Sequence, residues 1–196
     1  MFRIEFDFAE VQKFATSLGA AADQIPFATA VALNRAADVT RNFLIKQTWP
    51  QHISQRNSSF IAASLTTRGA RADKRSAAVE IYDKLDRGNL QMQALGGVRS
   101  PRGGSSLAVP SSKIARTSRG VPQRLRPKSL VNAIRIKDAL YTRDKRGRLK
   151  LMYVLKSRTP IPKRVPFYED FATSMRRELI VALPIAIAKA MATRRR

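Results

Sequence analysis

Apolar residues recur with helical spacing over two long stretches of the chain. In residues 26–47, one side of a helix would carry Phe27, Ala30, Val31, Asn34, Ala37, Thr40 and Leu44, and Leu33, Ala36 and Phe43 would widen this stripe. In residues 167–192, the positions that recur every four residues are Phe167, Phe171, Met175, Leu179, Leu183, Ile187 and Met191. Such stripes are typical of helices that bury one face. The sequence therefore predicts two long core helices, and Trp49-Pro50 is expected to end the first.

Shorter stretches alternate apolar and polar residues, which is typical of strands with one buried face. We expect strands at residues 2–6, 65–68 and 77–82, short helices at 8–18, 54–64 and 86–95, and a β-hairpin formed by residues 133–142 and 149–155. The hairpin turn would be the basic sequence from Arg143 to Arg148. These elements indicate an α+β fold, in which a small antiparallel sheet is packed by helices and the last helix is long.

The middle of the chain shows neither the helical spacing nor the strand alternation of apolar residues. Between Val98 and Ser129 the residues are mainly Gly, Ser, Pro, Arg and Lys, with one apolar patch from Leu107 to Pro110. A compact domain rarely contains so long a connection without regular structure. A segment this poor in core-forming side chains cannot bury its own surface. We therefore expect residues 98–129 to form an extended basic arm, ordered by a neighbouring subunit, within one domain built from residues 1–97 and 130–196.

Positive charge dominates the composition. The chain has 37 Lys and Arg against 14 Asp and Glu, a formal net charge of +23, and no acid occurs from Arg87 to Lys137. Such a chain attracts polyanions, acidic protein surfaces or anionic lipid, and composition does not choose among them. Aromatic residues do not alternate with the cations of the arm, so base stacking on single strands is not expected. The candidate residues for contacts with another subunit or with DNA are Arg99, Arg102, Lys113, Arg116, Arg119, Arg124, Arg126 and Lys128.

The side chains form no recognisable catalytic or metal-binding pattern. Cysteine is absent and His52 is the only histidine, so an ordinary zinc site with nitrogen and sulfur ligands is excluded. Carboxylates are few and scattered, and the glycine pairs Gly96-Gly97 and Gly103-Gly104 lack the spacing of a phosphate-binding loop. We expect a protein without enzymatic activity, cofactor or bound metal.

No segment is expected to cross a membrane. The longest apolar stretch, Leu179 to Ala188, is far shorter than the roughly 20 residues that a bilayer requires. The N-terminal sequence Met1 to Phe8 alternates charged and apolar residues, unlike a secretory signal. A helix lying on a membrane surface is the alternative interpretation of the last apolar stripe, but a core helix packed on the sheet is favoured.

Three stretches resemble the minor tail protein Z family of long-tailed phages and prophages, whose members are called tail-completion proteins. The first is ALNRAADVTR, from Ala32 to Arg41, and the second is Gly96-Gly97 with the basic run that ends at Leu107–Pro110. The third starts at Leu151, continues through IPKRVPF and ends at Phe167, before the last helix. Together they cover most of the chain.

The resemblance implies a structural component of the virion at the head-proximal end of the tail or at the neck, joining the tail to the connector. It implies a homo-oligomeric ring of six copies, made in the host cytoplasm, with the tail terminator, tube or connector as neighbours and genomic DNA in the channel. From charge alone, the alternative is a basic, non-enzymatic nucleic-acid-binding protein. The salt dependence of binding to duplex DNA would distinguish the two.

Overall fold

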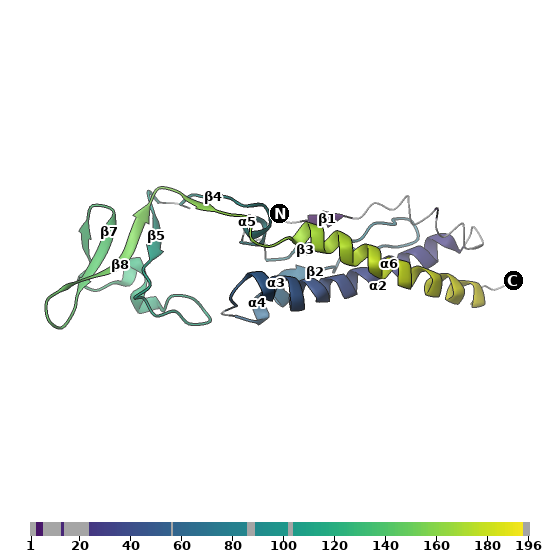
Figure 1. Cartoon of the computed structure of the whole chain (residues 1–196), viewed down its shortest axis with the longest axis horizontal. Coiled ribbons are helices and arrows are strands. Elements are labelled where there is room, and N and C mark those ends of the chain that lie inside the picture. The colour runs from purple at the N-terminus through teal and green to yellow at the C-terminus, as the bar shows by residue number, and fades with distance from the viewer. Residues whose placement is uncertain are drawn as a thin grey trace. The chain divides into compact units, whose positions relative to one another are not determined.

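The computed structural model describes residues 3–5, 13, 24–55, 57–85, 89–101 and 104–193. It divides into two compact units. The first unit comprises Met1–Ser54, Ser58–Leu95 and Lys163–Arg196. The second unit comprises Gln55–Asn57 and Gly96–Pro162. Long helices characterise the first unit and antiparallel strands the second (Figure 1). The α+β fold and its long C-terminal helix are confirmed. The helix expected at residues 8–18 lies outside the described residues, apart from Lys13.

This division differs from the single domain that the sequence predicts. The expected hairpin belongs to the second unit, whereas the last helix belongs to the first. The strand β4 (Gly97–Arg99) begins the second unit and pairs antiparallel with β9 (Thr159–Ile161), which lies at its end. These two strands carry the chain into and out of the second unit. The residues between them contact mainly one another and form a separate compact unit.

The two long helices of the first unit pack against each other in antiparallel directions (Figure 1). They are α2 (Ile25–Phe43) and α6 (Phe167–Ala192). The buried hydroxyls of Thr40 and Ser174 lie 3.0 Å apart. One turn beyond the end of α2, the Thr48 hydroxyl donates a hydrogen bond of 2.5 Å to Asp170. Polar pairs inside this interface satisfy groups that would otherwise be buried without partners.

The apolar stripe of α6 is confirmed almost throughout, whereas that of α2 is confirmed except at its N-terminal end. On α6, Met191 is 38% exposed, and the six other residues of the predicted stripe are buried. On α2, Phe27 and Val31 are each 39% exposed. The buried side of α2 is formed mainly by small residues, which let two helices approach closely: Ala28, Thr29, Ala30, Ala32, Leu33, Ala36, Ala37 and Thr40.

The first long helix does not end at Trp49-Pro50. It continues through a π-helical turn, η1 (Leu44–Thr48), into α3 (Trp49–His52). Pro50 lies in the first turn of α3, where its missing N–H needs no partner. The helix ends where Ile53 adopts an extended conformation and its N–H bonds the Trp49 carbonyl at 3.0 Å. The prediction that Trp49-Pro50 ends the helix was wrong, because the π-helical turn η1 precedes Pro50 and accommodates it.

A small antiparallel sheet completes the described part of the first unit. Its strands are ordered β1 (Arg3–Glu5), β3 (Glu80–Asp83) and β2 (Leu65–Thr66). Two short helices, α4 (Ser59–Ser64) and α5 (Asn89–Leu95), flank these strands in sequence. The strands contribute buried Leu65 and Ile81 to the same core as the two long helices. The predicted strands are therefore present, although shorter than expected.

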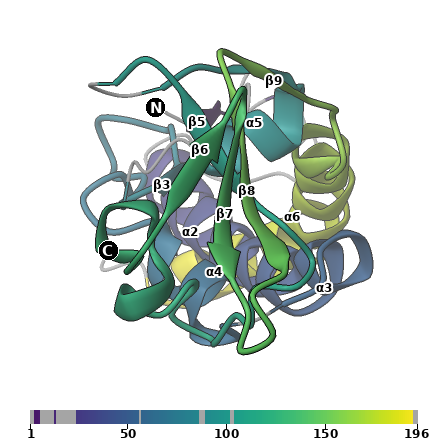
Figure 2. The same cartoon turned by 90° about the vertical axis from the view of Figure 1, so that its left-hand side faces the viewer.

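The second unit contains a four-stranded antiparallel sheet (Figure 2). Its order is β5 (Leu107–Pro110), β8 (Leu149–Lys156), β7 (Ala139–Arg143) and β6 (Ile134–Ile136). The stretch that the sequence predicts as one strand, residues 133–142, is therefore divided into two. Lys137 has a positive φ of 48°, which permits a two-residue turn between Ile136 and Ala139. The expected hairpin is thus part of a three-stranded meander.

The middle segment is not the extended arm that the sequence predicts. It forms β5 on the sheet and then two short 3-10 helices, η2 (Gln123–Leu125) and η3 (Pro127–Ser129). Ile114 is buried against β8 in a small core. The prediction was wrong because it required periodic apolar residues. This segment instead supplies irregularly spaced ones to that core, namely Ala108, Ile114, Val121, Leu125 and Leu130.

Candidate functional site

Most of the excess positive charge of the chain lies in the second unit. Residues 96–162 contain 17 Lys and Arg, but their only acids are Asp138 and Asp144. The rest of the chain has 20 Lys and Arg against 12 Asp and Glu. Every Lys and Arg that the structure describes within residues 96–162 is exposed. The second unit therefore presents a strongly cationic surface, which we call the cationic unit surface.

Hydrogen bonds from β8 hold the first part of the middle segment. The Ser111 N–H donates to the Met152 carbonyl at 2.9 Å, and the Ser111 hydroxyl donates to the Leu151 carbonyl at 2.9 Å. Since β5 ends opposite Tyr153, the chain continues along β8 toward the β7–β8 turn. The cations that follow Ser111 in sequence therefore leave the sheet beside the middle of β8.

Two arginines of the middle segment lie near the phenol of Tyr153. Burial raises the pKa of this phenol, and the positive charges of Arg116 and Arg126 oppose the increase. Both guanidinium groups also donate to backbone carbonyls of their own segment, Arg116 to Pro110 at 3.1 Å and Arg126 to Val121 at 3.3 Å. These bonds orient the two cations without neutralising them.

A shallow groove in this segment combines hydroxyls with a guanidinium group. It is lined by Ser112, Ile114, Arg116, Thr117 and Ser118. Thr117 and Gly120 exchange two backbone hydrogen bonds of 2.9 Å, so the groove ends in a tight turn. Hydroxyl and guanidinium donors are the groups that commonly contact phosphate oxygens. The groove can therefore accept an anionic oxygen.

Six of the eight candidate cations that the sequence singles out lie on the folded middle segment. Arg99 lies on β4, in the two-stranded ribbon and not in the four-stranded sheet, and Arg102 lies outside the described residues. The other six are exposed on the middle segment: Lys113, Arg116, Arg119, Arg124, Arg126 and Lys128. Their grouping on one folded segment replaces the expected flexible arm.

Sequence reasoning missed the cations of the β7–β8 turn as candidate residues. Residues 143–150 include five exposed Lys and Arg, namely Arg143, Lys145, Arg146, Arg148 and Lys150. Arg148 forms the one ion pair among the described residues of the second unit, with Asp144 at 3.1 Å. The sequence shows the high density of cations in this short stretch. It does not show that the stretch lies at one end of a folded sheet.

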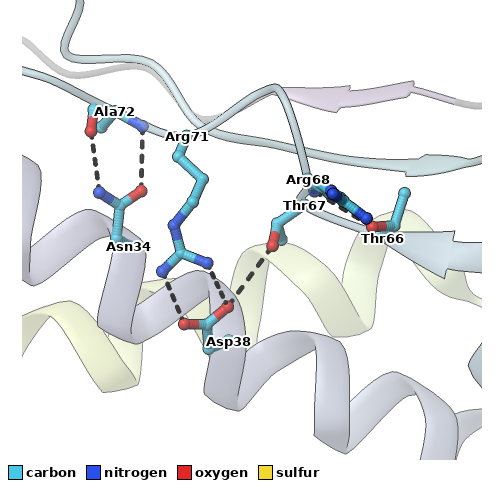
Figure 3. Close-up of polar contacts among 7 residues, drawn as sticks. All are labelled: Asn34, Asp38, Thr66, Thr67, Arg68, Arg71 and Ala72. Atoms are coloured by element: carbon cyan, nitrogen blue, oxygen red, sulfur yellow. Dashed lines mark hydrogen bonds and ion pairs between the residues drawn. The ribbon is translucent and has the colours of Figure 1, made fainter.

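The main polar cluster of the first unit fastens a loop to α2 (Figure 3). The Asn34 amide donates to the Ala72 carbonyl at 2.8 Å and accepts from the Ala72 N–H at 2.9 Å. The Arg71 guanidinium forms two hydrogen bonds with the Asp38 carboxylate, at 3.1 and 2.8 Å. These groups bond one another, so the cluster has a structural role.

The described residues contain no group of three His, Cys, Asp or Glu side chains that could hold a metal ion. His52 is exposed, and its Nδ1 lies 2.9 Å from the Thr48 carbonyl oxygen in the preceding helical turn. No helix in the described part of the chain combines the length and apolar character needed to span a bilayer.

We compared the chain with protein families, with curated proteins and with solved structures, and nothing matches it in any of the three comparisons.

Proposed function

We propose that the protein is a structural component of a phage virion, a tail-completion or neck protein that joins the head-proximal end of the tail to the connector. The resemblance of three sequence stretches to the minor tail protein Z family supports this role. One of these stretches, Ala32–Arg41, lies within α2, and another leads from β8 into α6. The stretches therefore belong to elements that build both units.

The observation that carries the proposal is the unequal distribution of charge between the two units. Residues 96–162 have 17 cations against two acids, whereas the rest of the chain has 20 cations against 12 acids, so the two parts offer different surfaces. Charged surfaces of this kind fix the partner and register of an assembly. In the proposed role, the cationic unit surface binds acidic faces of a neighbouring tail or neck protein. Several copies surround the tail axis as a homo-oligomeric ring.

The folded middle segment changes the mechanism expected for assembly. A flexible arm would lose conformational entropy when a neighbour orders it, whereas a preformed surface loses much less. The proposed contact is therefore made by a surface that exists before assembly. Deleting residues 98–129 would remove β5 and part of the small core, so it would disrupt the second unit itself.

Mass spectrometry of purified virions tests the virion role. We expect the chain as a stoichiometric component, and particles made without its gene should have unjoined or unstable tails in electron micrographs. Complete infectious particles that lack the chain would contradict the proposal.

A second candidate function is the binding of nucleic acid. The groove lined by Arg116 and by the hydroxyls of Ser112, Thr117 and Ser118 favours it. Phosphate contacts release counterions, so affinity falls steeply with salt. Fluorescence anisotropy with a labelled duplex at several salt concentrations measures this slope. A steep negative slope supports the function, and no binding at physiological salt excludes it.

A further inference from the structure

The turn between β7 and β8, taken with the strand ends that carry Arg143 and Lys150, is the most basic short stretch of the second unit. In residues 143–150, five of the eight residues are Lys or Arg, and all five side chains are exposed. The only acid in this stretch is Asp144. Strand pairing leads directly into the turn, because Arg143 lies opposite Leu149 in the register of β7 and β8. The turn is therefore a cationic loop on a short two-stranded base.

The Asp144 carboxylate holds the turn in place by accepting hydrogen bonds from backbone N–H groups of the turn. Its Oδ1 accepts the N–H groups of Arg146 and Arg148 at 2.8 and 2.9 Å, and its Oδ2 accepts the Arg148 Nε at 3.1 Å. Across the turn, the Arg143 Nη1 donates to the Gly147 carbonyl at 2.8 Å. Arg143 and Arg148 therefore form hydrogen bonds within the turn and stabilise its conformation. The backbone that carries the remaining cations is thereby preformed.

We infer that this turn contacts the phosphates of double-stranded nucleic acid. The side chains of Lys145 and Arg146 form no hydrogen bond or ion pair with any residue that the structure describes, so their charges are available to a ligand, and exposed Lys150 adds a charge that also acts on the Asp144 carboxylate. A two-stranded β-ribbon fits the major groove of a duplex, which is about 12 Å wide. Cations at its tip then reach phosphates on both sides of the groove.

Residues 96–162 have no exposed aromatic residue, which favours a duplex over a single strand. The only aromatic residues in positions 96–162 are Tyr141, which is half-buried, and Tyr153, which is buried. Single strands are bound largely by stacking bases on exposed aromatic rings. Hot spots of protein interfaces are enriched in Trp, Tyr and Arg, and the only large apolar or aromatic side chain that residues 143–150 expose is Leu149. Phosphate binding needs charge alone, which the turn supplies.

The inference rests on the second candidate function and names its contact element. It does not depend on the virion role. The middle segment contributes further exposed cations to the same unit, and Ser111 holds this segment to β8 by its bonds to Leu151 and Met152. The experiment therefore has to separate the turn from the middle segment and from general charge.

Three variants of the full-length protein, each with three exposed cations replaced by glutamine, make this separation. The turn variant combines Lys145→Gln, Arg146→Gln and Lys150→Gln, which leaves the bonds of Asp144 intact. The segment variant combines Arg119→Gln, Arg124→Gln and Lys128→Gln. The control variant changes exposed cations of the first unit, Arg35→Gln, Lys46→Gln and Lys189→Gln. All three have the same net charge, and circular dichroism checks that each is folded.

Duplex affinity is measured by fluorescence anisotropy over a range of salt concentrations. We expect the turn variant to bind roughly tenfold or more weakly than the control variant, and its salt slope to fall by about 2.7 because three phosphate contacts contribute about 0.9 each. Amide chemical shifts of the unmodified protein give an independent test. Adding duplex should shift the amides of residues 143–150 more than those of the first unit.

Each other outcome overturns the inference. If the turn variant binds like the control variant while the unmodified protein binds duplex, nucleic-acid binding stands and the turn is not its contact element. If the unmodified protein does not bind duplex at physiological salt, both ideas fail. If polyglutamate displaces the duplex at equal charge concentration, the surface recognises acidic protein. Tighter binding of a single strand than of a duplex also contradicts the inference.

Discussion

The phenol of Tyr153 donates a hydrogen bond of 2.6 Å to the carbonyl oxygen of Leu125, and this bond fastens the middle segment to β8. Tyr153 is central in the four-stranded sheet, since it lies opposite both Pro110 on β5 and Leu140 on β7. Leu125 ends the 3-10 helix η2. A strand and a loop that are distant in the sequence thus share one small core. The order of the cationic unit surface depends on this contact.

Replacing Tyr153 with phenylalanine should destabilise the second unit. The change removes the hydrogen bond to Leu125 while keeping the ring, and a hydrogen bond of this kind contributes on the order of 1 kcal/mol to stability. Denaturant unfolding measures the loss. The matched control is Tyr141→Phe on β7, because the Tyr141 hydroxyl bonds no described residue. A similar loss in both variants would contradict a special role of the Tyr153–Leu125 bond.

Replacing Asn34 with alanine should detach the loop that it holds on α2. Asn34 satisfies both the N–H and the carbonyl of Ala72, which is buried, so the substitution leaves two backbone groups without partners. We expect a loss of about 1–3 kcal/mol in the free energy of unfolding. Asn42→Ala on the exposed side of the same helix is the control and should change stability little. Faster amide exchange near Ala72 would locate the effect.

The two sides of α6 should respond differently to the same substitution. Ile187 is 6% exposed in the core of the first unit, whereas Ile185 is 49% exposed on the opposite side. Ile187→Ala should lower stability by about 2–5 kcal/mol, because it removes buried methylene groups and leaves a cavity. Ile185→Ala should have a much smaller effect on the monomer. Equal losses in thermal unfolding would show that the face carrying Ile185 is also buried.

The β7–β8 turn should lose order at low pH. Hydrogen bonds from the backbone of Arg148 lower the pKa of Asp144 below its ordinary value of 3.8, helped by the Arg146 backbone and the Arg148 side chain. The lowered pKa means that the carboxylate stabilises the turn above about pH 4. This contribution is lost as the pH falls through the folded-state pKa. Amide shifts of Arg146 and Arg148 should follow this titration.

Asp144→Asn provides the control for that titration. The amide keeps an acceptor oxygen but has no charge to lose, so the shifts of Arg146 and Arg148 should no longer change with pH in this range. Asp138→Asn, at the other turn of the meander, should leave them as in the unmodified protein. A titration that persists in Asp144→Asn would show that another group controls the turn.

The sequence by itself determined the long helices and the position of the charge. The stripe from Phe167 to Ile187 repeats every four residues, and such a local pattern reports the buried face directly. The cations of residues 87–137 and the absence of cysteine were equally readable, because composition does not depend on folding. The α+β fold class followed from the same periodic stretches.

Only the tertiary structure decided how the middle segment is used. Ile114 and Leu125 have no periodic neighbours, so their burial became visible only once β8 supplied Met152 and Tyr153 beside them. The exposure of Phe27 and Val31 on α2 likewise depends on the partner helix, because small residues such as Ala28 and Ala32 let a second helix approach closely. Periodicity records which residues can be buried within one element, whereas burial across elements depends on contacts between residues far apart in the sequence.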